Sequence, residues 1–180
     1  MQQVAPTDPS GGGVLEEFIK QNAVLSAINS SSVNTLRINT VRYSDSEINV
    51  CWPCLRMGRN GSFVDNAGAG GIFGAVDVDT GKITAVADEN QHHYTEHPDT
   101  HVALIEFCVP QWEEACAVAK RAAQSVPEAT FVGWDLAYTD RGWIVVEGNH
   151  CPLIIYQIAT ERGLLKEFDS MRKSVMMGCE

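Results

Sequence analysis

The chain has 180 residues, of which 44% are hydrophobic, and this length and composition suit one compact core rather than two. With 13 lysines and arginines against 23 acidic residues, the net charge of -10 disfavours nonspecific binding to nucleic acid or to anionic membranes. No run approaches the roughly 20 apolar residues of a membrane span, and the N-terminus lacks the basic-then-apolar layout of a secretion signal, so we expect a cytoplasmic protein.

The predicted elements form one domain over residues 14–180, preceded by a linker or disordered segment over 1–13 that is rich in Pro, Gly and polar side chains. In chain order we expect a hinge strand and a short helix over 14–28, strands over 33–43 and 48–57, a hairpin of 75–78 with 82–87, a helix over 110–126, a hairpin of 131–138 with 143–146, and a helical region over 153–173 that is interrupted at Gly163.

The strand predicted over residues 33–43 alternates polar and apolar side chains. Thr35, Arg37 and Asn39 share one face, and Leu36 and Ile38 share the other. An arginine on the polar face of a sheet suits a phosphate ligand. The alternative is a surface arginine on an edge strand.

Cys51 and Cys54 have the spacing of a redox motif or of half a zinc site. A zinc site needs a second pair of ligands, and a redox motif should open a helix, whereas this pair lies inside a predicted strand. We therefore interpret both residues as buried thiols.

Residues 65–71 are dense in glycine. Glycine lets the backbone approach a ligand closely and leaves bare amide groups for an anion. A plain loop is the alternative.

Residues 91–101 form a polar loop that holds four of the five histidines. Clustered histidines can bind zinc, but this cluster lacks acid or thiol ligands at a firm spacing. A mobile substrate loop or a solvated surface loop is the favoured interpretation.

The most informative segment runs from residue 131 to residue 149, where a turn joins two apolar runs in the pattern of a β-hairpin. A three-residue loop that ends at Gly142, with this glycine in the left-handed conformation, pairs Thr139 with Trp143. Asp135 then lies opposite Glu147, and Asn149 follows on the same face.

The opposite face of this hairpin should be apolar and buried. The same register places Trp134 there, and we expect Trp134 to be buried and Asp135 to be accessible, because a slip of one residue would exchange the two faces. The residues predicted for the apolar face are Val132, Trp134, Leu136, Ile144 and Val146.

Two carboxylates and a carboxamide on one face suit a hard cation such as Mg²⁺. Two acids placed opposite each other would repel and weaken the strand pairing unless a cation bridges them. The alternative is that both acids belong to the solvated side of an amphipathic hairpin.

Six short blocks, in this order, resemble one family. They are Ser32-Val-Asn-Thr-Leu-Arg37, Arg56-Met-Gly-Arg59, Val64-Asp-Asn66 with Gly70-Gly71, His97-Pro-Asp-Thr100, Gly133-Trp-Asp135 and Glu147-Gly-Asn149. The last two resemble the metal-binding end of ATP-grasp enzymes. Together the blocks resemble the sugar-transfer-associated ATP-grasp family, also described as alpha-L-glutamate-ligase-related, over residues 14–165.

The resemblance implies that ATP and Mg²⁺ are the cofactors. Asp135 and Glu147 would bind one Mg²⁺, and Glu147 and Asn149 a second one, between the ATP phosphates. Arg37 would be the catalytic ligand of a phosphate or acyl phosphate. The other implied cofactor-binding residues are Glu16 and Glu17, in a hinge strand against which adenine packs, and Asn66, Gly70, Gly71 and His97.

The implied fold is α+β, with a mostly antiparallel sheet that binds ligand on one face and packs helices on the other, as in the second half of an ATP-grasp fold. The implied activity is the ATP-dependent activation of a small-molecule carboxylate as an acyl phosphate for attack by an amine or another nucleophile. Since only residues 1–13 precede the hinge, we expect the lysine-bearing first half of the clamp to be missing, or to come from another chain or a second copy. Without it, the chain would be a non-catalytic nucleotide- or metal-binding module or a structural partner subunit.

Overall fold

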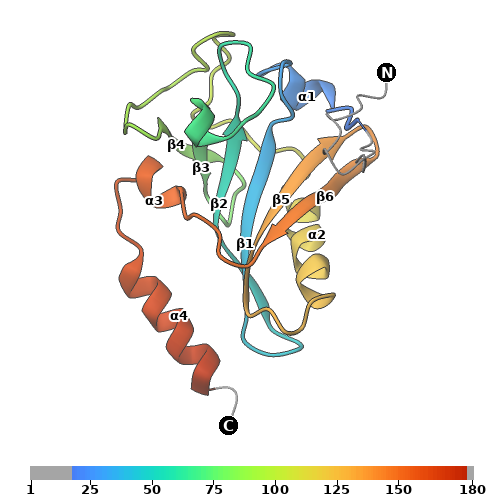
Figure 1. Ribbon diagram of the computed structural model, residues 1–180, viewed down its shortest axis with the longest axis vertical. Helices are drawn as coiled ribbons and strands as arrows, with labels where there is room; N and C mark the ends of the chain where they lie inside the picture. Colours follow the sequence, from blue (N-terminus) through green and yellow to red (C-terminus); the bar gives the residue numbers. More distant parts are fainter. Residues whose placement is uncertain (1–17, 178–180) are drawn as a thin grey trace, which may run out of the picture.

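The computed structural model describes residues 18–177, which form one antiparallel sheet with helices packed on it (Figure 1). Neighbouring strands are all antiparallel, in the order β4-β3-β2-β1-β5-β6. The strands are β1 (Thr35–Arg42), β2 (Ile48–Met57), β3 (Ile72–Val76), β4 (Ile83–Asp88), β5 (Phe131–Thr139) and β6 (Gly142–Asn149). The helices are α1 (Ala23–Ser26), the 3-10 turn η1 (Ala67–Ala69), α2 (Trp112–Gln124), α3 (Tyr156–Ala159) and α4 (Leu165–Met177).

The element order agrees with the sequence-based expectations. The helix predicted over 110–126 begins at Trp112, because Gln111 has a φ of 48°, a left-handed conformation that an α-helix cannot include. The C-terminal helical region is divided around Gly163 into α3 and α4. The predicted hinge strand falls largely on residues 14–17, which lie outside the described part; residues 18–20 have no regular structure, and Gln21 makes a single bridge to Thr139.

One face of the sheet carries the largest core cluster. Leu36 and Ile38 of β1 and Leu55 of β2 pack there against Leu25 and the apolar stripe of α2. The buried members of that stripe are Ala115, Val118, Ala119 and Ala123. Burial of this stripe stabilises both the helix and the sheet. Two glutamates in the first turn of α2 also stabilise the helix by complementing its dipole.

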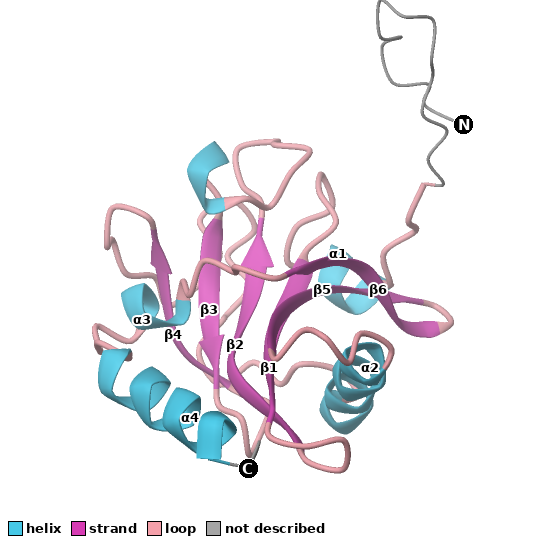
Figure 2. Ribbon diagram, turned by 60° about the horizontal axis from the view of Figure 1, so that its bottom comes forward, coloured by secondary structure: helices cyan, strands magenta, loops and turns pink. Residues whose placement is uncertain are grey.

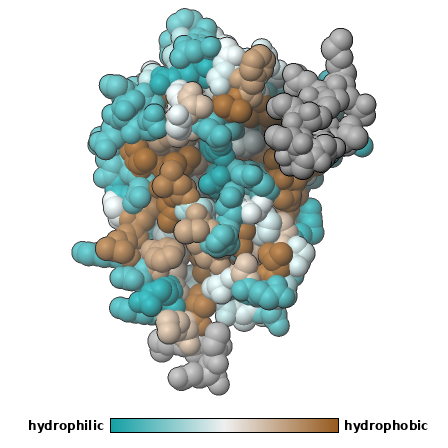
Figure 3. Space-filling view, in the orientation of Figure 1, coloured by the Kyte–Doolittle hydropathy of each residue, from teal (hydrophilic) through white to brown (hydrophobic). Residues whose placement is uncertain are grey.

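The α+β class and the antiparallel sheet are confirmed, and helices cover part of the second face as well. There α3 packs Ala159 near Cys54, Phe73 and Ala75, and α4 packs Phe168 near Trp52. The strands run between α4 on one side and α2 on the other (Figure 2). In the orientation of Figure 1, a hydrophilic band runs down the middle of the molecule between hydrophobic patches (Figure 3).

The β5–β6 hairpin differs from the predicted register close to its turn. Gly142 has a left-handed φ of 99°, as predicted, but Thr139 pairs with Gly142 and not with Trp143. A β-bulge between Asp135 and Leu136 absorbs the difference of one residue. Asp135 therefore pairs with Glu147, as predicted.

The shifted register changes which side chains of β6 face the core. Trp143 is buried and its ring packs 4.8 Å from that of Tyr138. Ile144 and Val146, which were predicted for the apolar face, are exposed. Trp134 is buried, as predicted.

Cys51 and Cys54 are both buried free thiols on β2, which confirms their interpretation from the sequence. Burial raises the pKa of both thiols, that of Cys51 to about 12. Neither thiol therefore ionises readily near neutral pH.

Candidate functional site

Residues paired across the strands form a row on the second face of the sheet. Cys54, Arg37, Asp135 and Glu147 are successive cross-strand partners on β2, β1, β5 and β6. Because paired residues point to the same side of a sheet, these side chains share one face. Helix α3 packs against the Cys54 end, and the charged end of the row lies beyond it.

Asp135 lies at the centre of a buried charge cluster. Arg37 donates to both carboxylate oxygens, from Nε to Oδ1 and from Nη2 to Oδ2, the latter at 2.7 Å. Arg56 of β2 donates from Nη1 to Oδ2 at 2.7 Å. Two parallel bonds from one guanidinium group are among the strongest pairings that a carboxylate can make.

The prediction that Asp135 is accessible is therefore wrong, since its exposed fraction is 3%. Burial alone would raise the pKa of Asp135, but the hydrogen bond from Arg37 and the charges of Arg37 and Arg56 outweigh it and hold this pKa below its ordinary value. Burial likewise opposes the charge of Arg37, yet Asp135 raises the pKa of that guanidinium group. Both groups are therefore charged near neutral pH.

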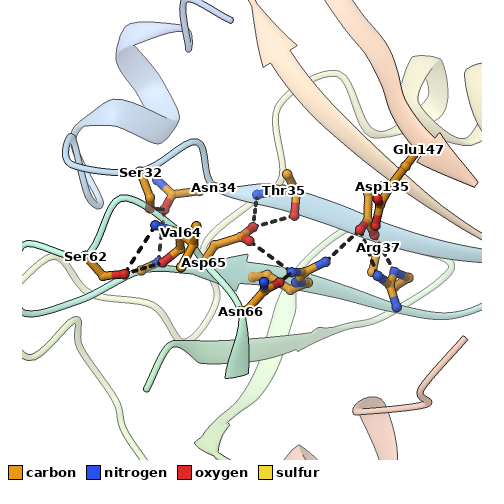
Figure 4. A network of polar contacts seen from close by, with 12 residues as sticks. Ser32, Asn34, Thr35, Arg37, Ser62, Val64, Asp65, Asn66, Asp135 and Glu147 are labelled. Carbon is orange, nitrogen blue, oxygen red and sulfur yellow. Dashed lines mark hydrogen bonds and ion pairs between the residues drawn. The ribbon is translucent and has the colours of Figure 1, made fainter. Parts of the chain in front are cut away.

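Arg56 extends the cluster toward the glycine-dense segment. Its Nη2 donates to Oδ1 of Asp65 at 3.0 Å and also to the side-chain oxygen of Asn66. The second oxygen of Asp65 accepts from the backbone N–H of Thr35 at 2.8 Å and from the Thr35 hydroxyl. A continuous chain of polar contacts thus runs from Asn66 to Asp135, with Glu147 beside it (Figure 4).

The glycine-dense segment forms a compact turn around η1. Gly70 has a left-handed φ of 87°, and its carbonyl oxygen accepts from Nε of Arg59. A Cβ on Gly71 would lie 2.5 Å from the carbonyl oxygen of Asp65, so this position requires glycine. Arg59 also pairs with buried Asp88 at 3.3 Å, which anchors the turn to β4.

Glu147 and Asn149 form the solvent-facing end of the site. Glu147 is exposed, and the amide nitrogen of Asn149 donates to its Oε1 at 3.0 Å. Asp135, Glu147 and Asn149 supply the oxygen donors that a hard cation prefers. Among residues 18–177, no three acid, histidine or cysteine side chains gather closely enough to hold a metal by themselves, so a cation here would need the Asn149 amide or oxygen atoms of a bound ligand.

His97 is not brought to this row. It is fully buried, with Nε2 donating to the carbonyl oxygen of Gly58 at 2.8 Å and Nδ1 accepting from the backbone N–H of Asp99 at 3.3 Å. Since both ring nitrogens are bonded inside the protein, His97 holds the segment after β2 in place. Glu16 and Glu17 lie outside the described residues.

A cleft of about 290 Å³ lies at the tip of the hairpin. Its lining combines the apolar residues Phe18, Ile19 and Ile144 with the polar residues Lys20, Thr139, Asp140 and Arg141. Ile144 pairs with Ala137, two residues from Asp135, so it lies on the face of the charged row. The cleft therefore has a mixed lining, and Ile144 extends it onto the face of the sheet that carries the row.

Arg56, Asp65 and Ile144 are site residues that sequence reasoning did not assign. Arg56 and Asp65 lie within the quoted blocks, but their roles depend on how β2 and the following loop align with β1. Ile144 was assigned to the core, because the one-residue shift near the turn was not foreseen. A predicted strand pairing that placed Arg56 beside Thr35 would have revealed the roles of Arg56 and Asp65.

The fold and the site together define a class of protein: an antiparallel α+β domain with an arginine–aspartate cluster, a glycine turn and a Glu-x-Asn strand on one face. The chain belongs to the sugar-transfer associated ATP-grasp family, whose model matches residues 8–173. Membership places it among ATP-binding, ligase-like proteins.

Neither a curated protein nor a solved structure matches the chain. No helix within residues 18–177 has both the length and the apolar composition needed to cross a membrane.

Proposed function

We propose that the chain binds ATP with Mg²⁺ on the face that carries Arg37, Asp135 and Glu147, and that it activates a small-molecule carboxylate as an acyl phosphate for attack by an amine or another nucleophile. The observation that carries this proposal is the pairing of Asp135 with Glu147 beside Arg37 in a chain of the ATP-grasp family. We place this reaction in the cytoplasm, and the acid and the acceptor stay open.

The acidic, basic and glycine-turn residues of the site have different proposed roles. Asp135, Glu147 and Asn149 would hold Mg²⁺, which neutralises and orients phosphate oxygens when it is bound. Arg37 and Arg56 supply planar donors for anionic oxygens of the phosphate or of the carboxylate. Asn66, Gly70 and Gly71 would lie along the path of the phosphates as a tight turn, in which the backbone N–H groups of Gly70 and Gly71 donate to the carbonyl oxygens of Ala67 and Asn66.

The cleft at the hairpin tip suits the base of the nucleotide. Ile19 and Ile144 contribute apolar surface to its mixed lining, and its volume of about 290 Å³ accommodates a planar ring system. Phe18 and Ile19 in its lining belong to the segment that resembles the hinge strand, in which Glu16 and Glu17 are our proposed adenine or ribose contacts. In this proposal the base and the phosphates lie along one face of the hairpin.

A second candidate function is nucleotide binding without turnover. Within the described part of the chain, no lysine pairs with the charged row: Lys20 bonds Asp140 at 3.4 Å, and Lys82 bonds Glu106 at 2.7 Å. A lysine over the phosphates would then come from outside the described residues, for example from a second copy of the chain. Catalysis of phosphoryl transfer depends on this kind of charge neutralisation and positioning.

Titration with ATP and Mg²⁺, followed by measurement of ADP release, separates these functions. Binding with ADP release that depends on an added carboxylate and amine supports the ligase. Binding without release supports the nucleotide-binding module. Absence of binding contradicts both and favours a structural partner subunit.

A further inference from the structure

One oxygen of the Asp135 carboxylate, Oδ2, already has two charged partners, whereas Oδ1 accepts from Arg37 alone. Oδ2 accepts two charged hydrogen bonds, both at 2.7 Å, one from Arg37 and one from Arg56. An sp² carboxylate oxygen offers two lone-pair directions, so these two donors fill Oδ2. A cation that binds this oxygen must therefore displace a guanidinium nitrogen.

The two arginines are held in different ways. Arg37 donates hydrogen bonds to Asp135 from two nitrogens, one to each carboxylate oxygen. Arg56 reaches Asp135 with one nitrogen only and holds Asp65 and Asn66 with the other. Arg56 therefore loses one bond on release and stays anchored by Asp65, whereas Arg37 would lose both of its bonds.

We infer that Arg56 is a positioning residue that competes with a divalent cation for Asp135 and thereby couples cation binding to anion binding. This inference rests on the proposed function, because it concerns the same site. When a cation takes Oδ2, Nη1 of Arg56 is released on the face of the row, where a phosphate or carboxylate oxygen can accept its hydrogen bond. An anion that draws Arg56 away opens Asp135 to the cation in turn, since coupling between two ligands is reciprocal.

The experiment measures the binding of Mn²⁺ alone to the full chain by electron paramagnetic resonance. Arg56→Gln should bind Mn²⁺ about tenfold more tightly than the unmodified chain, because a charge-assisted bond no longer occupies Asp135. In EDTA the same variant should bind ATP more weakly, because one anion partner is lost. These opposite shifts distinguish a shared residue from a purely structural one.

Two further variants control for bulk charge. Arg172→Gln removes the same charge from an exposed position on α4 and should change neither affinity. Arg56→Lys keeps the charge but cannot span Asp65 and Asp135 as a guanidinium does, so it should show a smaller gain in Mn²⁺ affinity. It also serves as the test if Arg56→Gln fails to fold in a thermal melt.

Unchanged or weaker Mn²⁺ binding by the folded Arg56 variants overturns the inference. So does a gain of the same size in the Asp135→Asn background, where the contested carboxylate is gone. The proposed function fails by a different result, namely absence of Mg²⁺-dependent ATP binding by the unmodified chain. The two failures are therefore distinguishable.

Discussion

At the scale of single residues, the site depends on a buried acid that is neutralised by arginines. Asp135 pairs with Arg37 and Arg56, and Asp65 balances the second arginine. Strand alternation in the sequence predicts the face of Arg37. It does not predict Arg56 as a partner, because that contact depends on the alignment of β2 against β1, which a single sequence does not show.

Asp135→Asn should lower the free energy of unfolding by roughly 3–5 kcal/mol, because it leaves buried guanidinium groups without their counter-charge. Denaturant melts of both proteins measure this difference. Asp79→Asn, at an exposed turn, should change little. Equal small effects would contradict the burial of the cluster.

Asp88 supports the glycine turn through Arg59 and should make stability depend on acid pH. Burial opposes its charge, but hydrogen bonds from the backbone of His92 and from the Tyr94 hydroxyl lower the pKa of Asp88 to about 2, from 3.8. A depressed pKa stabilises the fold above about pH 4, and this contribution of roughly 2 kcal/mol is lost as the pH falls toward 2.

Unfolding free energies measured from pH 5 to pH 2 test this dependence. The difference between the unmodified chain and Asp88→Asn should shrink as the pH falls, because protonation of Asp88 removes the same charge. Parallel curves would show that Asp88 is not held in the way described.

At the scale of elements, the β5–β6 hairpin shows what local patterns can predict. Its existence, the left-handed Gly142 and the pairing of Asp135 with Glu147 are confirmed. The pairing predicted between the turn and Leu136 is wrong by one residue. A bulge depends on how Trp143 packs on Tyr138 and α2 contacts β6, and such tertiary contacts are not visible in strand alternation.

Gly148→Ala tests the packing that orients Glu147 and Asn149. A Cβ at this position would lie 2.6 Å from the buried ring of Trp134, so we expect a loss of roughly 1–3 kcal/mol in unfolding free energy from overpacking. Gly68→Ala, with open space around its Cβ, is the matched control. Thermal or denaturant melts in which both variants behave alike would contradict the tight contact.

At the scale of the whole molecule, two layers of helices leave one part of the sheet for ligands. Helices α1 and α2 cover the first face, whereas α3 and α4 cover the second face only beyond the charged row. The sequence predicts the α+β class and the helices themselves. It does not predict that α3 and α4 pack on the ligand face, because amphipathic patterns show which side of a helix is buried and not against what.

The central claim is that the face with Asp135 and Glu147 binds ATP with Mg²⁺, and calorimetric titration of two matched variants tests it most directly. Glu147→Gln removes a charge from the row, and Glu128→Gln removes the same charge from the exposed connection between α2 and β5. Loss of an oxygen ligand should weaken Mg²⁺-dependent ATP binding by about tenfold or more in Glu147→Gln, with no change in Glu128→Gln. Equal affinities in the two variants would contradict the claim.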